Sequence, residues 1–556
     1  MKFSDMPYER VDFEKVGKEL AQLTQELEAA KSGEEQFAVH QRFYVLTDHV
    51  RTLMTIGNIR HNANTVDEFY EKERKYYDEM GPVFQNQVLV YMQKLYASPY
   101  REYLESKIGP VAFKNMEVAM KAFDERVIAL SQEENALTTE YDQLIASAKI
   151  QFDGKELNLS LLRPYLVSPD REIRRQAWQK KTEFFLENAE KLDEIYDKLV
   201  KNRTAQAKAM GYENYLELGY YRMGRNCYGQ REVESFRRQI KQYFVPFTEK
   251  LHDRRRKRLG LDKLSYIDQA VYFPQGNPAP IGTPEEIMAA GQKMYRELSP
   301  ETGEFFDFMM ENELFDVLGR KNKRAGGYMT YMPDYHSPFI FANFNGTSGD
   351  VDVVTHECGH AFQGYLSGQD PIREHADIGM ETAEIHSMSM EFMTENWMEL
   401  FFGDRKQDYI DMHLEDSAIF IPYGCMVDEF QHIVYEHPEL TPTQRHEAWL
   451  KLEAEYRPHM DYEDNPFFGK GALWQQQLHI YNAPLYYIDY CLAQTCALQY
   501  KIWKDKDFKE AWASYLKLCK LSASDFYTKM IPAVGLECPF EEGCVQHLVD
   551  NLEASL

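Results

Sequence analysis

The sequence contains no C-x-x-C pair, no apolar run long enough to cross a membrane, and no excess of positive charge. A membrane-spanning helix needs about 18 or more consecutive apolar residues, so we expect no membrane association. The formal net charge is −26, and an acidic surface of this kind repels a phosphate backbone. We therefore expect no nucleic-acid partner and attribute the acidic balance to solubility. The sequence does not indicate an oligomeric state.

The cysteines are few and scattered. There are eight in 556 residues, at positions 227, 358, 425, 491, 496, 519, 538 and 544. Disulfide frameworks belong mainly to small secreted domains, so this distribution favours reduced thiols. Residues 1–7 also lack the apolar segment of a secretory signal. The sequence therefore predicts a cytoplasmic protein.

Proline and glycine are scarce between residues 11 and 150, and apolar residues recur there at three- and four-residue spacing. That period is typical of amphipathic helices, which we expect near 35–56, 66–96 and 112–149. Hydrophobic residues make up 44% of the chain, enough for a large core. We predict a mainly α-helical protein with an N-terminal helical region, 1–160, and a second helical region, 161–556.

The stretch 325–350 differs from the helical background. Residues 326–332 and 338–344 are rich in aromatic and β-branched types and are bounded by Gly, Pro and Asn. These features are typical of short strands. We predict two strands here, after helices at 284–297 and 300–318, and a further helix that begins near residue 349.

The predicted helix at 349 contains the pentapeptide His356-Glu357-Cys358-Gly359-His360. Histidines at i and i+4 lie on one helix face, so their imidazoles can bind one tetrahedral cation, usually zinc. Glu357 can reach a water at that metal and act as a general base. Cys358 points away from the ligand face, and we expect a small core residue there.

A catalytic zinc usually takes a third protein ligand, and the segment 380–391 offers four candidates. Glu381 and Glu384 share a helix face, as do Glu384 and Glu391, whereas His386 lies off that face. The spacing does not choose between Glu381 and Glu384. The neighbouring residues are small or apolar, which indicates a buried helix whose carboxylates need partners, and one of them could orient a ligand histidine.

The residues T-H-E-C-G-H-A-F at 355–362, followed by A-E-I-H-S at 383–387, resemble the oligoendopeptidase F and Pz-peptidase branch of the thimet-oligopeptidase-like zinc metallopeptidases. The resemblance implies one Zn²⁺ per chain, held by His356, His360 and Glu384. It implies that Glu357 is the catalytic base. It also suggests Glu391 as the carboxylate that orients a ligand histidine.

A third block, G-A-L-W-Q-Q-Q-L-H-I-Y-N-A-P-L-Y-Y-I-D-Y at 471–490, resembles the family's C-terminal His and P-F-Y-x-x-x-Y segment. It implies catalytic roles for His479, Tyr486 and Tyr490, with Leu485 in place of the usual Phe. Neutral donors of this kind stabilise the negative charge of a tetrahedral intermediate. Because the chain holds 37 tyrosines, simple core packing is the alternative, and the role of Tyr487 stays open.

The predicted strand at 338–344 resembles the family's edge strand, to which an extended peptide could add through main-chain hydrogen bonds. We expect Phe341, Ala342 and Asn343 to contact the substrate backbone. The resemblance implies two helical lobes around a deep cleft or channel, with a small sheet beside the motif helix. Such enclosure fits an endopeptidase that acts on short, unstructured peptides.

Two alternatives remain from the sequence. The first is a zinc metallocarboxypeptidase with the same helix, which would need a cation for the C-terminal carboxylate of its substrate. The second is a non-catalytic helical peptide-binding protein. The sequence does not reveal which peptide bonds are cleaved.

Overall fold

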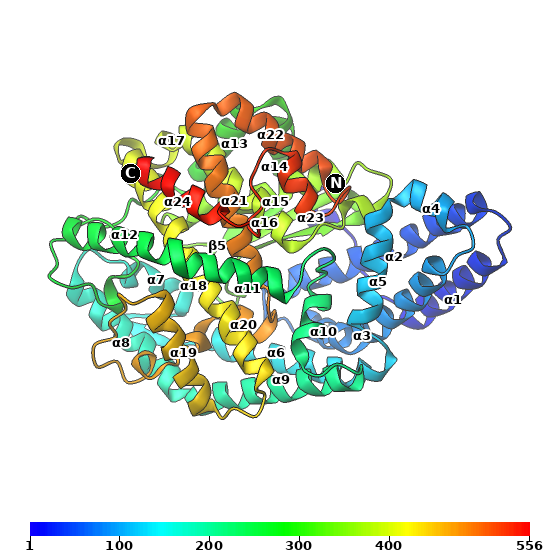
Figure 1. The fold of residues 1–556 in the computed structure, drawn as a ribbon, viewed down its shortest axis with the longest axis horizontal. Helices are drawn as coiled ribbons and strands as arrows, with labels where there is room; N and C mark the ends of the chain where they lie inside the picture. The colour runs from blue at the N-terminus through cyan, green and yellow to red at the C-terminus, as the bar shows by residue number, and fades with distance from the viewer. Residues whose placement is uncertain (556) are drawn as a thin grey trace.

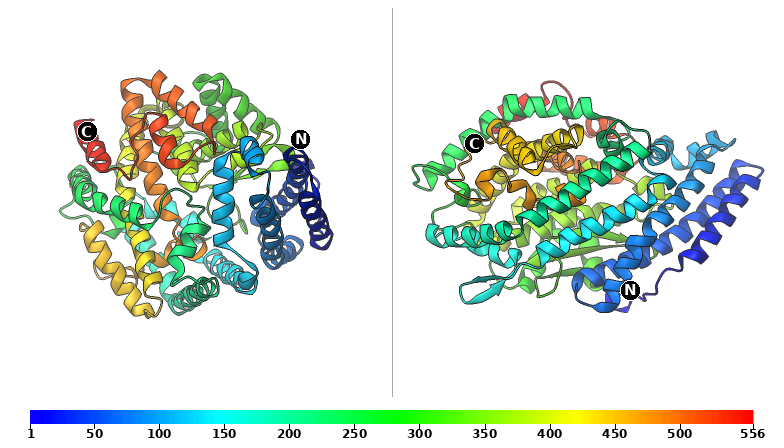
Figure 2. Two further views of the ribbon diagram at one scale, coloured as in Figure 1. Left: turned by 45° about the vertical axis from the view of Figure 1, so that its right-hand side comes forward. Right: turned by 90° about the horizontal axis from the view of Figure 1, so that it is seen from below.

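The computed structural model describes residues 1–555 and is dominated by α-helices (Figure 1). The first quarter of the chain forms long helices joined by short turns, as predicted. Their bounds are α1 Phe13–Ala29, α2 Gly33–Ala63, α3 Glu68–Tyr96, α4 Arg101–Ile108, α5 Pro110–Ala122 and α6 Ile128–Ala146. Residues 11–116 enclose a hydrophobic core of their own, and these helices project at one side of the molecule (Figures 1 and 2).

A larger core unites most of the remaining helices. The middle of the chain contributes α7 Leu159–Leu166, α8 Arg171–Glu187, α9 Ala189–Ala209, α10 Tyr215–Arg222, α11 Gln230–Gln239, α12 Val245–Arg258, α13 Pro284–Leu298 and α14 Pro300–Glu311. The last part contributes α15 Gly349–Ser367, α16 Met380–Met393, α17 Glu399–Phe402, α18 Lys406–Glu436, α19 Pro442–Tyr456, α20 Leu478–Asn482, α21 Tyr487–Lys506, α22 Phe508–Leu521, α23 Tyr527–Ala533 and α24 Cys544–Ser555.

Two small sheets interrupt the helices. Strands β1 Ile150–Phe152 and β2 Lys155–Leu157 form an antiparallel hairpin that the sequence analysis missed. Strands β3 Phe315–Leu318, β4 Tyr328–Met332 and β5 Ser337–Phe344 form a second sheet in the order β3-β5-β4. The two strands predicted at 326–332 and 338–344 are therefore present, and α15 begins at Gly349, as expected. The mainly helical fold with a small sheet beside the motif helix is confirmed.

The predicted helix at 300–318 is wrong in its second half. Helix α14 ends at Glu311, and Glu313 has a φ of 55°, a left-handed conformation that cannot continue a right-handed helix. The chain then enters β3, which pairs in parallel with β5. This strand has four residues and only one that is β-branched, so its local sequence gives little sign of strand structure.

The strand order also corrects the prediction about the substrate edge. Strand β5 pairs with β3 on one side and with β4 on the other, so it is the central strand. Phe341 pairs with both neighbouring strands, and the Ala342 carbonyl accepts a hydrogen bond from the buried Lys323 ammonium. Asn343 donates to the carbonyls of Arg324 and Gly326, at 2.9 and 2.8 Å. These residues are engaged within the protein, and the two outer edges without a strand partner among residues 1–555 belong to β3 and β4.

Candidate active site

Helices α15 and α16 pack against each other and bring the candidate ligands together. Their close approach depends on Gly359. A Cβ atom there would lie 2.5 Å from the carbonyl oxygen of His386 and 2.6 Å from the Cα of Ser387, so only glycine fits. The motif helix and the backbone of α16 are thus in direct contact beside the two histidines.

The three predicted ligands converge. The Glu384 Oε2 atom lies 3.2 Å from His360 Nε2 and 3.4 Å from His356 Nε2. Ligand bonds of 2.0–2.1 Å at tetrahedral angles place donor atoms about 3.3 Å apart. The donor set and its spacing therefore fit Zn²⁺. Glu381, which the spacing left as an alternative, does not join this group.

Electrostatics within this group favour a cation. Burial alone would raise the pKa of Glu384, but the charge of His360 and hydrogen bonds from both histidines hold that pKa well below its usual value. Burial raises the pKa of Glu357. The Glu357 carboxylate lies beside the glycine turn before β4. A Cβ atom on Gly327 would be only 3.6 Å from Glu357 Oε1.

Glu391 links His356 to a residue that the sequence analysis did not find. His356 Nδ1 donates to Glu391 Oε1 at 2.6 Å, and His413 Nε2 on α18 donates to Glu391 Oε2 at 2.5 Å. Burial opposes ionisation of Glu391, but these hydrogen bonds lower its pKa to about 2. An ionised Glu391 fixes the tautomer of His356 that leaves Nε2 free for a metal. No sequence spacing marks His413, because the contact arises from helix packing.

Glu391→Gln should weaken metal binding by about 10- to 100-fold, as is typical when the partner of a ligand histidine is lost. The expected cause is loss of the charge that orients His356. A competition titration with a metal-binding dye measures the affinity. Glu381→Gln, a buried carboxylate on the same helix outside the ligand group, is the control and should bind metal normally. Equal affinities for the two variants would contradict this role of Glu391.

The third sequence block also reaches the site, because α21 packs against α16. Tyr486 Oη donates a hydrogen bond to Glu384 Oε1, which leaves Oε2 to face the histidines. The rings of Tyr486 and Tyr490 are 4.8 Å apart, and Tyr490 Oη lies 3.2 Å from His479 Nε2. Tyr487 instead packs its ring between His479 and Phe420.

A short hydrogen-bond chain sets the state of His479. Tyr423 donates to the amide oxygen of Gln477 at 2.9 Å, and the Gln477 amide donates to His479 Nδ1 at 2.9 Å. The proton of the neutral ring is therefore on Nε2, toward Tyr490. Burial lowers the pKa of His479 to about 4, so the ring stays neutral near pH 7. The sequence analysis found neither Gln477 nor Tyr423.

Two further residues singled out in the sequence are packed in the interior. Cys358 is fully buried, and His386 is also fully buried, under Gly359. Neither belongs to the ligand group.

A second cluster of metal-binding residue types, Glu249, His252 and His459, brings its donor atoms within 4.8 Å of one another. Two hydrogen bonds of this cluster bear on whether it could hold a cation. Arg255 donates to His252 Nδ1 at 2.9 Å, and His459 donates to Glu249 at 2.6 Å. The guanidinium occupies the lone pair of His252 Nδ1, and its charge repels a cation nearby.

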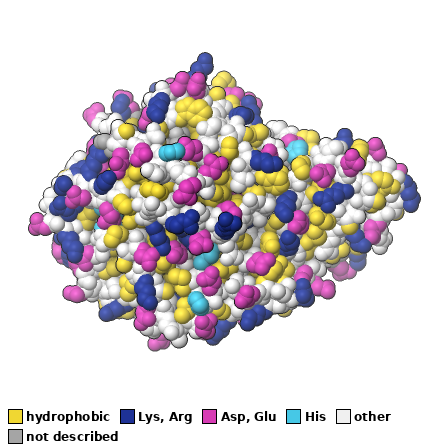
Figure 3. Space-filling view, viewed as in Figure 1, with side chains coloured by type: hydrophobic (Ala, Val, Ile, Leu, Met, Phe, Trp, Pro, Cys, Tyr) yellow, Lys and Arg dark blue, Asp and Glu magenta, His cyan; other side chains and the backbone are white. Residues whose placement is uncertain are grey.

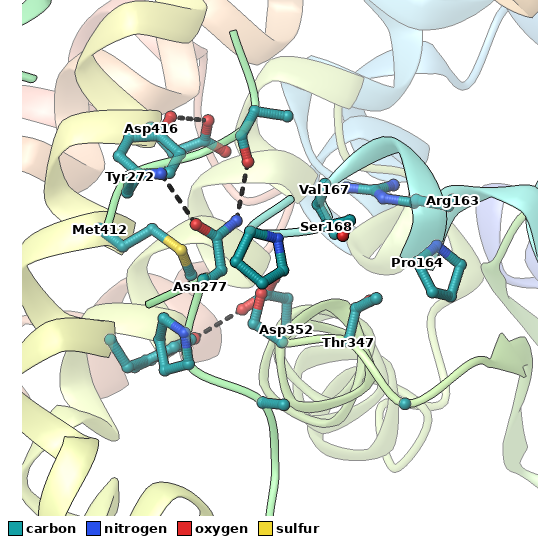
Figure 4. A pocket seen from close by; sticks show the side chains of 18 of the residues that line it. Arg163, Pro164, Val167, Ser168, Tyr272, Asn277, Thr347, Asp352, Met412 and Asp416 are labelled. Atoms are coloured by element: carbon teal, nitrogen blue, oxygen red, sulfur yellow. Dashed lines mark hydrogen bonds between the residues drawn. The ribbon is translucent and has the colours of Figure 1, made fainter. Parts of the chain in front are cut away.

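A cavity of about 270 Å³ lies at the amino end of α15 (Figure 4). Its wall includes Asp352, one turn before His356, and His413, the partner of Glu391. In Figure 4, Met412 lies at the left and Arg163 at the right, with Asp352 between them. None of the three candidate ligands lines this cavity, so it adjoins the ligand group on the side of Glu391 without containing it.

A partly buried pair of helix histidines, a glutamate beside them from a neighbouring helix and a second glutamate within the motif form the arrangement of a metallopeptidase site. The comparisons with known proteins agree. The family description "Peptidase family M3" matches residues 165–278 and 302–550, and "Peptidase M3 N-terminal domain" matches residues 3–123. The chain belongs to peptidase family M3, whose members use a metal cofactor. No curated protein sequence matches the chain.

Solved structures are similar over the full length. A Pz peptidase A crystallised with an inhibitor is 46% identical, with a TM-score of 0.98 over 100% of this chain and 99% of that one. A putative oligoendopeptidase F is 44% identical, with a TM-score of 0.98 and coverage of 100% and 98%. A putative oligoendopeptidase F from Bacillus anthracis str. Ames is 41% identical, with a TM-score of 0.94 and the same coverage. The chain is a metallo-oligopeptidase that acts as an endopeptidase.

No helix among residues 1–555 is both long and apolar enough to cross a bilayer.

Proposed function

We propose that His356, His360 and Glu384 bind one Zn²⁺ per chain, and that this site hydrolyses internal bonds of short, unstructured peptides. The observation that carries the proposal is the spacing of the three donor atoms, 3.2 and 3.4 Å from Glu384 Oε2 to the two Nε2 atoms. This is the spacing that three donors around one tetrahedral cation would have, and a cation would compensate the buried Glu384 carboxylate.

When bound, the metal supplies Lewis acidity and lowers the pKa of water. The protein residues then divide the proton transfers. Glu357 accepts a proton from the attacking water at its carboxylate and returns it to the leaving nitrogen as the peptide bond breaks. Its buried position, which raises its pKa, brings the base closer to the neutral range in which it must both accept and release a proton.

Tyr490 and His479 stabilise the oxyanion in this proposal. Because His479 Nε2 carries the ring proton, it donates to Tyr490 Oη and leaves the Tyr490 O–H free to donate to the substrate. Both groups are neutral. The Tyr490 O–H is the donor aimed at the developing charge, and His479 contributes through its hydrogen bond to Tyr490. Tyr486 holds Glu384 Oε1 and so keeps the carboxylate oriented.

The substrate backbone is proposed to add to the outer edge of β4, in place of the β5 edge suggested by the sequence. Strand β4 follows the Gly326-Gly327 turn, which lies next to Glu357, and no other described strand pairs with its outer side. Main-chain pairing tolerates varied side chains, as a broad oligopeptidase requires. Enclosure of this edge between two helical lobes would limit substrates to short peptides.

The charge of the surface gives no reason to restrict substrates to one sign. Lys and Arg side chains alternate with Asp and Glu over the face in Figure 3, despite the net charge of −26. The cysteines of the chain are free thiols, which supports the proposal that the protein works in the cytoplasm.

A short peptide blocked at both ends tests the proposed reaction. We expect internal cleavage with Zn²⁺ present, loss of cleavage after treatment with a chelator, and recovery when Zn²⁺ is added back. Mass spectrometry of the products identifies the bond that is cut. A carboxypeptidase would leave the blocked peptide intact and cut only the version with a free C-terminus, and a non-catalytic binding protein would cut neither.

A further inference from the structure

The tyrosines of the site leave the main chain at an unusual turn. The Tyr486 N–H donates to the Ala483 carbonyl at 3.2 Å, which closes a four-residue turn with Pro484 in its second position. Leu485 occupies the third position with a φ of 66°. A turn with Pro second and a positive φ third is of type II, where Gly or Asn is normally required. A leucine in this conformation is strained and must be held by its surroundings.

Two buried side chains from distant parts of the sequence hold the Leu485 backbone from both sides. Gln431 on α18 accepts the Leu485 N–H at its Oε1, at 3.0 Å. Arg225, in the connection between α10 and α11, donates from Nη2 to the Leu485 carbonyl at 2.6 Å. Gln431 is 1% exposed and Arg225 5%, so both hydrogen bonds are shielded from water and cannot be replaced by it.

Arg225 also fixes the start of the helix that carries Tyr490. The same Nη2 atom donates to Asp489 Oδ1 at 3.0 Å, and Tyr228 donates to that oxygen at 3.3 Å. Asp489 immediately precedes Tyr490 in α21. One guanidinium therefore ties the turn before Tyr486 to the first turn of α21.

The Leu485 side chain is held as firmly as its backbone. It is fully buried, and its Cδ1 occupies space that exists only because residue 219 is glycine. A Cβ on Gly219 would lie 2.6 Å from that atom. Backbone hydrogen bonds and side-chain packing thus require the same left-handed conformation, as expected for strain that is retained at a functional site.

We propose that Gln431 and Arg225 are positioning residues, which aim Tyr486 and Tyr490 into the active site by clamping the strained turn at Leu485. The proposal rests on the proposed role of the tyrosines in catalysis. Neither positioning residue contacts Glu384, His479 or the tyrosine hydroxyls in the described hydrogen bonds. Their effect on catalysis therefore passes through the turn, and it should appear in kcat.

Gln431→Met tests this, because methionine has similar length but offers the Leu485 N–H only a weak thioether acceptor in place of an amide oxygen. We expect kcat to fall by about 10- to 100-fold, as for a small displacement of catalytic groups, with KM and metal content unchanged. Gln36→Met is the matched control. Gln36 is equally buried and bonds to the backbone carbonyl of Leu27, in the N-terminal region, so its loss should lower stability without changing kcat.

Tyr490→Phe, alone and combined with Gln431→Met, shows whether the effect passes through the tyrosines. Tyr490→Phe alone should lower kcat by about 100-fold, and Gln431→Met should add little in that background, because coupled residues are not additive. An unchanged kcat in Gln431→Met, or additive effects, would overturn the clamp. If Tyr490→Phe is fully active, the proposed oxyanion role fails, and with it the clamp as stated, whatever Gln431→Met does.

Arg225→Lys provides a second variant that keeps a positive charge beside Asp489 but loses the planar guanidinium that bridges it to Leu485. We expect the same split, with lower kcat and unchanged KM. If Gln431→Met does not fold, this variant carries the test with the same Tyr490→Phe background, and an additive result would again reject the proposal.

Discussion

Glu357→Gln should lower kcat by about 10²- to 10⁴-fold while the metal stays bound. Removing a general base typically costs this much. Glutamine preserves the size of the side chain and its place on α15 beside Gly327, but it cannot accept the proton of the attacking water. Glu357 is not one of the three ligands, so metal content should match that of the wild-type protein.

Steady-state kinetics with a chromogenic or fluorogenic short peptide measure this loss, and elemental analysis of the same samples measures the metal. The pH dependence supplies a second check. Burial raises the pKa of Glu357, so the acidic limb of kcat/KM for the wild-type protein should lie above the range of an ordinary carboxyl group. A Glu357→Gln protein that retains turnover with metal bound would show that another group is the base.

Glu384→Ala should remove both the metal and the activity. It deletes one of three donors and the acceptor of the Tyr486 hydroxyl, and it leaves two histidines that alone do not complete a catalytic zinc site. The loss should be near total at metal concentrations that saturate the wild-type protein. Metal stoichiometry after dialysis, together with peptidase activity, measures both effects.

The comparison with Glu381→Ala makes this result specific. Both glutamates are buried on α16, and the sequence alone left both as possible ligands. Burial raises the pKa of Glu381 to about 7, and its carboxylate does not belong to the ligand group. Glu381→Ala should therefore retain metal and most activity. If Glu381→Ala loses the metal while Glu384→Ala keeps it, the third ligand has been assigned to the wrong residue.

The sequence predicted the parts of this site that depend on local spacing. Two histidines at i and i+4 share a helix face in any helix, so the convergence of His356 and His360 follows from the helical period. Helical spacing alone did not identify Glu384 as the third ligand, because Glu381 lies one turn away on a similar face. The resemblance to known peptidases chose Glu384, and the packing of α16 on α15 now brings its carboxylate to the histidines.

Contacts made only by tertiary packing were not predictable. His413 reaches Glu391 from α18, and Tyr423 on the same helix reaches Gln477, the neighbour of His479. No pattern in the sequence links these pairs. The order of strands is equally hidden, because β3 is short and pairs in parallel across an intervening connection. That omission made β5 look like an edge strand when it is the central one.

Gly359 gives the pentapeptide a structural role in helix packing as well as a role in metal binding. Its missing side chain lets the motif helix rest directly on the backbone of α16 at His386 and Ser387, so the fourth residue of the motif is restricted by shape as strictly as the first and last are by chemistry. Transplanting this zinc centre into another helical scaffold would therefore require moving a pair of helices with their contact surface. Copying the liganding side chains onto a single helix would not reproduce it.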